Sequence, residues 1–380
     1  MQIYLVGGAV RDALLNYPTS ECDYVVVGAT PEAMSAQGFI PVGKDFPVFL
    51  HPKTKEEHAL ARTERKTGRG YQGFSFNAAP SVTLEEDLVR RDLTVNAIAQ
   101  TDSGELIDPH NGQADIKNKI LRHVSDAFRE DPVRILRVAR FHARYAHLGF
   151  CIAEETMALM KQMVEEGEVD HLVHERVWRE LARALEERTP EMFFRALYEC
   201  GALAVLAPEI QTLMSGNNFS SAPAIRSLNT ATTQTNIGSI RIAAMLSTLK
   251  KEQALNLIQG LKMPNEFKDL ILLTCENLPL LRAEFQPDTN VTAQSLMSLF
   301  EKCSAFRRPE LFDRLIEVAR ALDHSEKKQR EAHYAKIQTA LKIAKNISAS
   351  DVSNTQLEGK DLGDAIRSKR VEAITGAITN

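Results

Sequence analysis

The chain has few of the features that would mark a secreted or zinc-binding protein. Its 380 residues include only five cysteines, an odd and widely scattered set with no CxxC motif and no cysteine–histidine cluster. This pattern argues against both a disulfide framework and a zinc site. A basic segment followed by an apolar core is also missing from the N-terminus, where MQIYLVGG starts as a strand instead. We therefore expect a reduced, cytoplasmic protein.

Long apolar runs and a large excess of charge of one sign are missing too. No run approaches the length of a membrane span, so we expect no membrane partner. The 46 Lys and Arg against 50 Asp and Glu leave a formal net charge of −4, which argues against indiscriminate binding to nucleic acid. The apolar content of 44% and charged content of 25% are ordinary for a globular protein. A chain of this length suggests two or three domains.

The first 28 residues combine the features of a phosphate site and a metal site. An apolar strand at 3–6 runs into Gly7-Gly8, a short helix opens, and a second strand carries Glu21 and Asp23. Because side chains alternate across a strand, the two acids would share one face. Paired carboxylates repel unless a cation lies between them, oxygen-only ligands suit Mg²⁺, and a helix N-terminus attracts phosphate. A surface acidic pair beside an ordinary glycine turn is the alternative.

Two further segments before residue 100 carry clustered charge. Residues 64–80 contain three glycines and three basic residues, which predicts a long mobile loop; a functional loop and a disordered surface excursion are both possible. Residues 84–95 predict an amphipathic helix with an acidic first turn. Adjacent Arg90 and Arg91 cannot face the same way on a helix, so one would reach a triphosphate while the other pairs with Asp92 or the core. A salt-bridged surface turn is the alternative.

The strongest helical signal spans residues 131–144. Asp131-Pro132 is a typical helix start. Apolar residues cover one face, and four arginines fall within an arc of about 120° on the opposite face. These are Arg134, Arg137, Arg140 and Arg144. Residues 117–144 hold eight Lys and Arg against three acids, so an anion is expected to bind there unless the stripe is only a solvated face.

From residue 152 onward the pattern is helical. Trp178, the only tryptophan, is expected to anchor the core, and the Ser/Thr/Asn-rich residues 216–235 predict a linker. The expected helices lie near 154–166, 175–187, 190–201, 239–260, 264–284, 292–303, 308–324 and 326–346, followed by a last helix near the C-terminus.

Ordered sequence blocks resemble the class II tRNA nucleotidyltransferases, the bacterial CCA-adding enzymes, whose head is shared with bacterial poly(A) polymerases. The match is close over about the first 210 residues and weaker beyond, and the succession of blocks is more specific than any one of them. The blocks are GGAVRD at 7–12, ECDYVVVG at 21–28, VGKDFPVFLHP at 42–52, ARTERK at 61–66, RRDLTVNA at 90–97, IDPHNG at 107–112, EDPVRILRVARF at 130–141, ERVWRE at 175–180, FFRALYECGAL at 193–203, PEI at 208–210 and GKDL at 359–362.

The resemblance implies an α+β protein that begins with a polymerase-β-like nucleotidyltransferase palm, a mixed sheet with helices, at 1–129. A helical neck at 130–214 and a helical body and tail at 215–380, which contact tRNA, would follow. Some longer relatives add a phosphohydrolase domain with a His-Asp doublet. No histidine is followed by aspartate in this chain, so we expect no activity of that kind.

The resemblance also implies roles for single residues. Glu21 and Asp23 match the two catalytic Mg²⁺ ligands, although the first is usually Asp. The positions that match ATP- and CTP-binding residues are Gly8, Arg11, Arg91, Arg137 and Arg140. Arg176 and Arg179 match the neck motif that selects the base, although an acid is common at the position of Arg176.

The implied activity is template-independent addition of C, C and A to the 3′ end of tRNA from CTP and ATP, by a monomer or homodimer. An enzyme that adds only A to tRNA and a poly(A) polymerase are the alternatives within the class. A tRNA-binding protein with a degraded site is the non-enzymatic alternative, which the retained acid pair disfavours. The large helical half disfavours a nucleotidyltransferase acting on small molecules.

Overall fold

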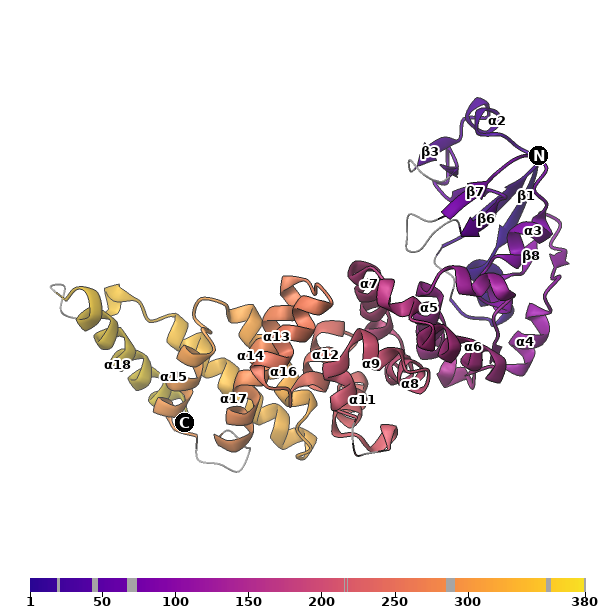
Figure 1. The fold of residues 1–380 in the computed structure, drawn as a ribbon. Helices are drawn as coiled ribbons and strands as arrows, with labels where there is room; N and C mark the ends of the chain where they lie inside the picture. The colour runs from indigo at the N-terminus through magenta and orange to yellow at the C-terminus, as the bar shows by residue number, and fades with distance from the viewer. Residues whose placement is uncertain are drawn as a thin grey trace. The chain divides into compact units, whose positions relative to one another are not determined.

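The computed structural model describes residues 1–18, 21–42, 47–66, 74–214, 216, 218–284, 291–352 and 357–378. The chain divides into two compact units, Met1–Leu206 and Ala207–Asn380. Within the described residues, every strand belongs to the first unit and the second is helical (Figure 1). None of the helices described is both long and apolar enough to cross a bilayer. The α+β class expected from the sequence is confirmed.

A seven-stranded mixed sheet forms the centre of the first unit, in the order β3-β4-β5-β2-β1-β8-β9. Neighbouring strands are antiparallel except β2 and β5, which are parallel. The strands are β1 (Gln2–Val6), β2 (Asp23–Val27), β3 (Ile40–Val42), β4 (Val48–Leu50), β5 (Glu57–Leu60), β8 (Ala99–Gln100) and β9 (Leu106–Ile107). The second strand therefore begins at Asp23, and Glu21 precedes it.

Two smaller strand pairs accompany the sheet. Strands β10 (Ile120–Leu121) and β11 (Cys151–Ile152) are parallel, whereas β6 (Thr63–Lys66) and β7 (Phe74–Asn77) are antiparallel. The prediction of a loop throughout 64–80 is thus wrong at both ends, because backbone pairing between the flanks overrides their glycine-rich and basic composition. Residues 67–73 lie outside the described residues.

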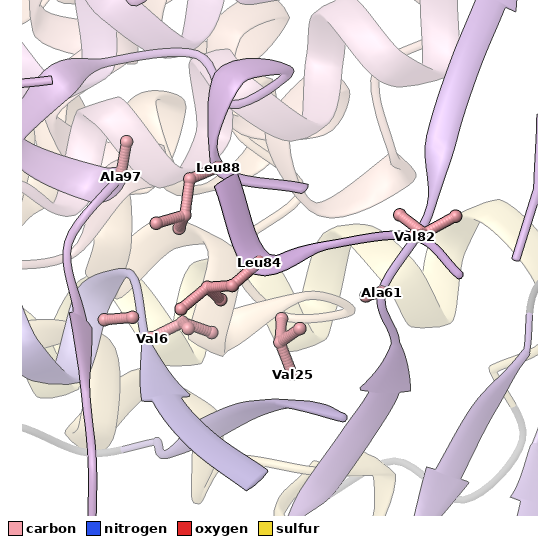
Figure 2. Packing of buried hydrophobic residues seen from close by; sticks show 8 residues of the cluster. Val6, Val25, Ala61, Val82, Leu84, Leu88 and Ala97 are labelled. Atoms are coloured by element: carbon pink, nitrogen blue, oxygen red, sulfur yellow. The ribbon is translucent and has the colours of Figure 1, made fainter. Parts of the chain in front are cut away.

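Side-chain alternation along β2 gives the sheet two apolar faces. Val25 packs with Val6 beneath α3 (Leu84–Val89), which contributes Leu84 and Leu88 (Figure 2). Val26 points to the other face, where α2 (Pro31–Ala36) contributes Met34. The sheet is therefore covered on both sides, and β1 and β2 are held rigidly at its centre.

The helix predicted over 84–95 is shorter than expected. A capping box between Thr83 and Glu86 starts α3, but the helix ends at Val89. Arg90 and Arg91 instead fold back onto the buried carboxylate of Asp87. The chain then passes through the 3₁₀ turn η1 (Thr94–Asn96) into β8. Helix α3 ends early because Arg90 and Arg91 both pair with the buried carboxylate of Asp87.

Most of the remaining helices of the first unit lie where the sequence predicts them. The full set is α1 (Gly8–Leu14), α4 (Gly112–Asn118), α5 (Val133–Tyr145), α6 (Glu154–Glu165), α7 (His174–Glu186), α8 (Glu191–Glu199) and α9 (Ala202–Leu206). The sequence does not predict α4 and α9. Helix α5 packs against α7 and α8, and Trp178 on α7 is buried as predicted.

The second unit is built around α12 (Gly238–Leu246), which is buried on every side and contacts α11, α14 and α16. Its helices are α10 (Pro208–Thr212), α11 (Pro223–Gln234), α12, α13 (Lys251–Gly260), α14 (Asn265–Glu284), α15 (Ala293–Lys302), α16 (Pro309–Ala321), α17 (Lys327–Lys345) and α18 (Gly359–Ile378). The linker prediction for 216–235 is wrong, because Ile225, Leu228 and Ala231 give α11 a buried apolar stripe despite its polar composition.

Candidate active site

The register between β1 and β2 places Asp23 beside the glycine pair. Asp23 is paired with Val6, the residue directly before Gly7. Gly7 has φ 70, and a Cβ on it would lie 2.9 Å from Nη1 of Arg91. Both the backbone conformation and the close approach therefore require glycine there. The turn between β1 and α1 brings an acidic and a basic group to one point.

The two predicted metal ligands, Glu21 and Asp23, are both exposed. Partial desolvation raises the pKa of Asp23, the nearby Arg91 opposes this shift, and Glu21 adds to it. Strand alternation does not relate the two acids, because Glu21 precedes β2; their mutual repulsion is nevertheless felt in the pKa of Asp23. Glu21 and Asp23 therefore lie close enough to interact, but not through the strand alternation that the sequence suggests.

The donor set at this point fits a hard divalent cation. It consists of carboxylate oxygens, and across the described ranges no third histidine, cysteine, aspartate or glutamate joins them to complete a metal-binding cluster. Two carboxylates leave most positions of an octahedral shell to water and to substrate phosphates, which is how Mg²⁺ is usually held. Glu21 and Asp23 are therefore the residues that would hold the ion.

Positive charge reaches the glycine turn from arginines rather than from a long helix. Helix α1 has only seven residues, so its dipole is short. Nη2 of Arg11 would lie 3.5 Å from a Cβ on Gly8, and Nη1 of Arg91 lies near Gly7. Two guanidinium groups thus border the turn, as a site for a polyanionic triphosphate requires.

Arg91 is oriented by a buried carboxylate. Asp87 accepts from Nη2 of Arg90 at 2.6 Å and from Nη2 of Arg91 at 3.3 Å, while Nη1 of Arg91 donates to the carbonyl of Asn96 at 3.3 Å. Burial alone would raise the pKa of Asp87, but Arg90 and Arg91 hold it below its usual range. Of the two adjacent arginines, Arg91 is the one that faces the glycine turn.

The arginines of α5 are not the unpaired stripe that helical periodicity suggests. Arg137 donates to Asp92 at 2.7 Å, Arg140 to Glu180 at 2.6 Å, and Arg144 pairs with Asp12 at 3.3 Å. The acids come from α1, α7 and the segment before η1, far away in sequence, so a count of local charges misses them. Arg140 is almost completely buried, whereas Arg137 is partly exposed.

The two neck arginines, Arg176 and Arg179, also differ in exposure and in pairing with an acid. Arg176 forms two hydrogen bonds to the carboxylate of Asp131, at 3.2 and 2.7 Å. Arg179, one helical turn further along α7, is exposed, and no acid among the described residues pairs with it. The fork of Arg176, expected to read a base, is therefore already bound to an acid from the start of α5.

Four residues of this region were not singled out from the sequence, namely Asp12, Asn96, Asp131 and Tyr145. Asp12 and Tyr145 hydrogen bond to each other, and Asn96 connects Arg11 to Asp92. All but Tyr145 lie inside the quoted sequence blocks, which could have drawn attention to them. Several of their hydrogen-bond partners are distant in sequence and can be identified only from the fold.

Comparison with known families agrees with this geometry. The model described as "Poly A polymerase head domain" matches residues 3–122, and that described as "Probable RNA and SrmB- binding site of polymerase A" matches 149–214. The palm sheet, the acid at the start of β2 and the arginine-bordered glycine turn define a nucleotidyltransferase.

Relatives at full length define the family more closely. A CCA-adding enzyme of Coxiella burnetii is 46% identical, covering 100% of this chain and 96% of its own. One from Pseudomonas putida is 46% identical over 98% of each chain, and one from Alteromonas mediterranea is 45% identical over 98% of this chain and 99% of its own. The chain belongs to the family of CCA-adding enzymes.

Solved structures agree in fold. A CCA-adding enzyme with ATP superposes with a TM-score of 0.71 at 24% identity, over 99% of this chain and 86% of the other. An apo form of a CCA-adding enzyme gives the same TM-score at 22% identity, over 100% and 91%. The resemblance extends through both units of the chain.

The raised pKa of Asp23 makes the site a source of instability when no metal is bound. The folded protein holds this proton more tightly than the unfolded chain, so stability falls as pH rises through the usual aspartate range. We expect Asp23→Asn to raise Tm at pH 7 in EDTA, and the gain to shrink as pH is lowered toward that range. Thermal melts across pH test this, with Asp364→Asn, an exposed aspartate of the second unit, as the control.

Mg²⁺ should reverse the order of Tm between the wild type and Asp23→Asn. An ion that binds only the folded state stabilises it, so Tm of the wild type should rise with Mg²⁺ and that of Asp23→Asn should not. A wild-type Tm indifferent to millimolar Mg²⁺ would argue against a metal role for the acid pair.

Proposed function

We propose that the protein is a CCA tRNA nucleotidyltransferase, which adds C, C and A to the 3′ end of tRNA from CTP and ATP and releases pyrophosphate without a template. The observation that carries the proposal is the convergence of Asp23, Arg11 and Arg91 on the turn at Gly7 and Gly8. The names of the full-length relatives support the choice of substrates.

Most of the catalytic task falls on positioning and charge neutralisation. Glu21 and Asp23 would hold Mg²⁺, which would supply Lewis-acid chemistry for activation of the tRNA 3′-hydroxyl and neutralisation of phosphate charge. Arg11 and Arg91 border the glycine turn and would neutralise the phosphates and the departing pyrophosphate. Arg137, the most exposed of the α5 arginines that pair with acids, would approach the same charge from the neck.

Base selection would lie on the neck. Arg179 is exposed and pairs with no acid in the part of the chain that the structure describes, and Arg176 with Asp131 presents donors beside acceptors. A donor and acceptor set of this kind can match the Watson–Crick edges of cytosine and adenine by hydrogen bonds alone. An arginine fork is suited to this because its planar geometry is preset. We include Asp131 with Arg176 and Arg179 as a base-selecting residue.

A poly(A) polymerase or an enzyme that adds only A remains the second candidate, because the matching head model carries the polymerase description. These activities share the head chemistry and differ in the use of CTP. The same primer-extension assay therefore separates them.

The second unit offers a surface for the RNA backbone. Helix α17 carries five exposed lysines, of which four fall within an arc of about 100° and are called here the α17 lysine face: Lys327, Lys328, Lys342 and Lys345. Its only acid, Glu331, faces Arg320 and Arg330 instead. Such a face fits phosphates read by shape rather than by sequence. Within the proposed division into a head at 1–129, a neck at 130–214 and a body and tail at 215–380, this face supports tRNA contact by the last part.

A cytoplasmic location is consistent with this chemistry. All five cysteines are free thiols, and none is paired in a disulfide. The substrates proposed, tRNA, ATP and CTP, are held in that compartment. We propose Mg²⁺ as the working metal and leave oligomeric state to hydrodynamic measurement.

Activity is tested by incubating the protein with tRNA that lacks its 3′ end, with CTP, ATP or both, and reading extension on a gel. Wild type should add two C residues with CTP alone and complete CCA with both nucleotides. Asp23→Ala should abolish incorporation yet keep tRNA affinity, because this exposed carboxylate is not part of the buried core. Turnover within about tenfold of wild type would remove Asp23 from catalysis. Extension with ATP alone by long A tracts would favour the polymerase.

Specificity is tested with Asp131→Ala and Arg179→Ala. Each lost hydrogen bond to a base edge should reduce discrimination by about ten- to a hundredfold, seen in kcat/KM for CTP, ATP, UTP and GTP. Arg137→Lys, which keeps a cation beside the buried carboxylate of Asp92, is the matched comparison and should weaken all nucleotides alike. Arg140→Ala is less suitable because it would leave Glu180 buried without its partner. Parallel losses in every variant would show that the neck residues only neutralise charge.

The α17 lysine face is tested by replacing Lys328, Lys342 and Lys345, which fall within an arc of about 100° around the helix, with alanine. Loss of three phosphate contacts should weaken tRNA binding and reduce the slope of log Kd against log salt by about two to three. A control with equal charge removes Lys53, Lys161 and Lys302, which are exposed but do not share a helix face. Equal losses in both triple variants would refute a dedicated surface.

A further inference from the structure

A buried carboxylate contacts Arg11, one of the two arginines that border the glycine turn. Asp12 follows Arg11 on α1 and is only 4% exposed. Its Oδ1 accepts from the Tyr145 hydroxyl at 2.6 Å and from Nε of Arg11 at 2.8 Å, and its Oδ2 accepts from Nη2 of Arg144 at 3.3 Å. Both oxygens are thus occupied by protein donors, two of which come from the end of α5.

These contacts determine how Arg11 can be used. Its Nε is bound to Asp12 and its Nη1 to Oδ1 of Asn96. Its guanidinium lies over the rings of Phe141 and Tyr145, at 5.0 and 4.9 Å from their centroids. Among the described residues no acceptor takes its Nη2, the nitrogen that lies beside Gly8. One donor group of a buried arginine is left facing the turn.

Stability alone does not explain why Asp12 and Arg11 are buried together. Taking charged groups out of water costs free energy that an ion pair only partly recovers, and apolar replacements are often as stable. The arrangement does fix a side chain that would otherwise have many rotamers, and preset donors neutralise developing charge without reorganisation. Burial also raises the pKa of Tyr145, so its hydroxyl keeps the proton that it donates to Asp12.

We propose that Asp12 and Tyr145 are positioning residues, which hold Arg11 so that its Nη2 meets the phosphates of the incoming nucleotide. The proposal rests on the proposed function of the site and adds two residues that do not touch the nucleotide themselves. It joins α1 of the palm to the last turn of α5. The triphosphate site would then be set in part by a helix that follows the palm in sequence.

The test uses Asp12→Asn and Tyr145→Phe in the full-length protein. KM for CTP and for ATP should rise by about ten- to a hundredfold in Asp12→Asn, as expected for loss of a charged hydrogen-bond partner. The ratio between the two nucleotides, and Kd for tRNA, should not change. Tyr145→Phe removes one hydroxyl and should give a smaller shift in the same direction. Tyr334→Phe, another buried tyrosine, is the matched control and should leave KM unchanged.

Direct binding separates positioning from a merely structural role. Asp12→Asn should weaken binding of CTP but not of cytidine, measured by calorimetry, because only the phosphates meet Arg11. Equal weakening of both ligands, or a fall in tRNA affinity of the same size, would overturn the proposal. This measurement does not require nucleotide addition, so it remains informative if the wild type fails to extend tRNA and the proposed function is wrong.

A double-mutant cycle gives the decisive result. If Asp12 acts only through Arg11, adding Asp12→Asn to Arg11→Ala should change KM for CTP by less than about twofold. Multiplying losses would show that Asp12 acts by another route and would refute the assignment. Should Asp12→Asn fold poorly, the same cycle is run with Tyr145→Phe, and the same two outcomes decide.

Discussion

Buried carboxylates that must find cationic partners organise the first unit. Asp12, Asp87 and Asp92 are all buried, and a buried carboxylate left unpaired is strongly destabilising. Arg11 and Arg144 satisfy the first, Arg90 and Arg91 the second, and Arg137 with Asn96 the third. Each pairing draws an arginine to a particular place around the glycine turn. The end of α3, the position of α5 on the palm and the geometry of the site follow from this requirement.

The exposed acids have the opposite character. Partial desolvation raises the pKa of Asp23, Arg91 opposes this shift and Glu21 adds to it, so ionisation of this acid costs free energy in the metal-free protein, whereas cations neutralise the buried acids. A bound cation and a triphosphate would complete the balance of charge that the protein alone leaves incomplete. The same feature that favours substrate binding therefore lowers the stability of the empty site.

Local patterns predicted most elements. The periodicity of residues 131–144 predicts α5, and the strand–glycine–helix pattern predicts β1 and α1. Most helices after 152 also appear where expected, although the helix expected over 239–260 is divided into α12 and α13, and α9 and α10 are additional. Predictions failed where a distant partner overrides composition. The polar composition of α11 predicts a linker because its apolar stripe is short, and the flanks of 67–73 pair as strands although their composition predicts a loop. Composition cannot report a partner that lies elsewhere in the chain.

The sequence by itself determined the acid pair, the glycine turn and the family, because these depend on short blocks whose chemistry is local. It could not decide which arginines remain available to a substrate. Arg140 and Arg176 are paired with Glu180 and Asp131, acids about forty residues away, whereas Nη2 of Arg11 is left at the turn. Only the packing of α5 against α1 and α7 brings those charges together, since the interaction of two charges depends on their separation in space and not along the chain.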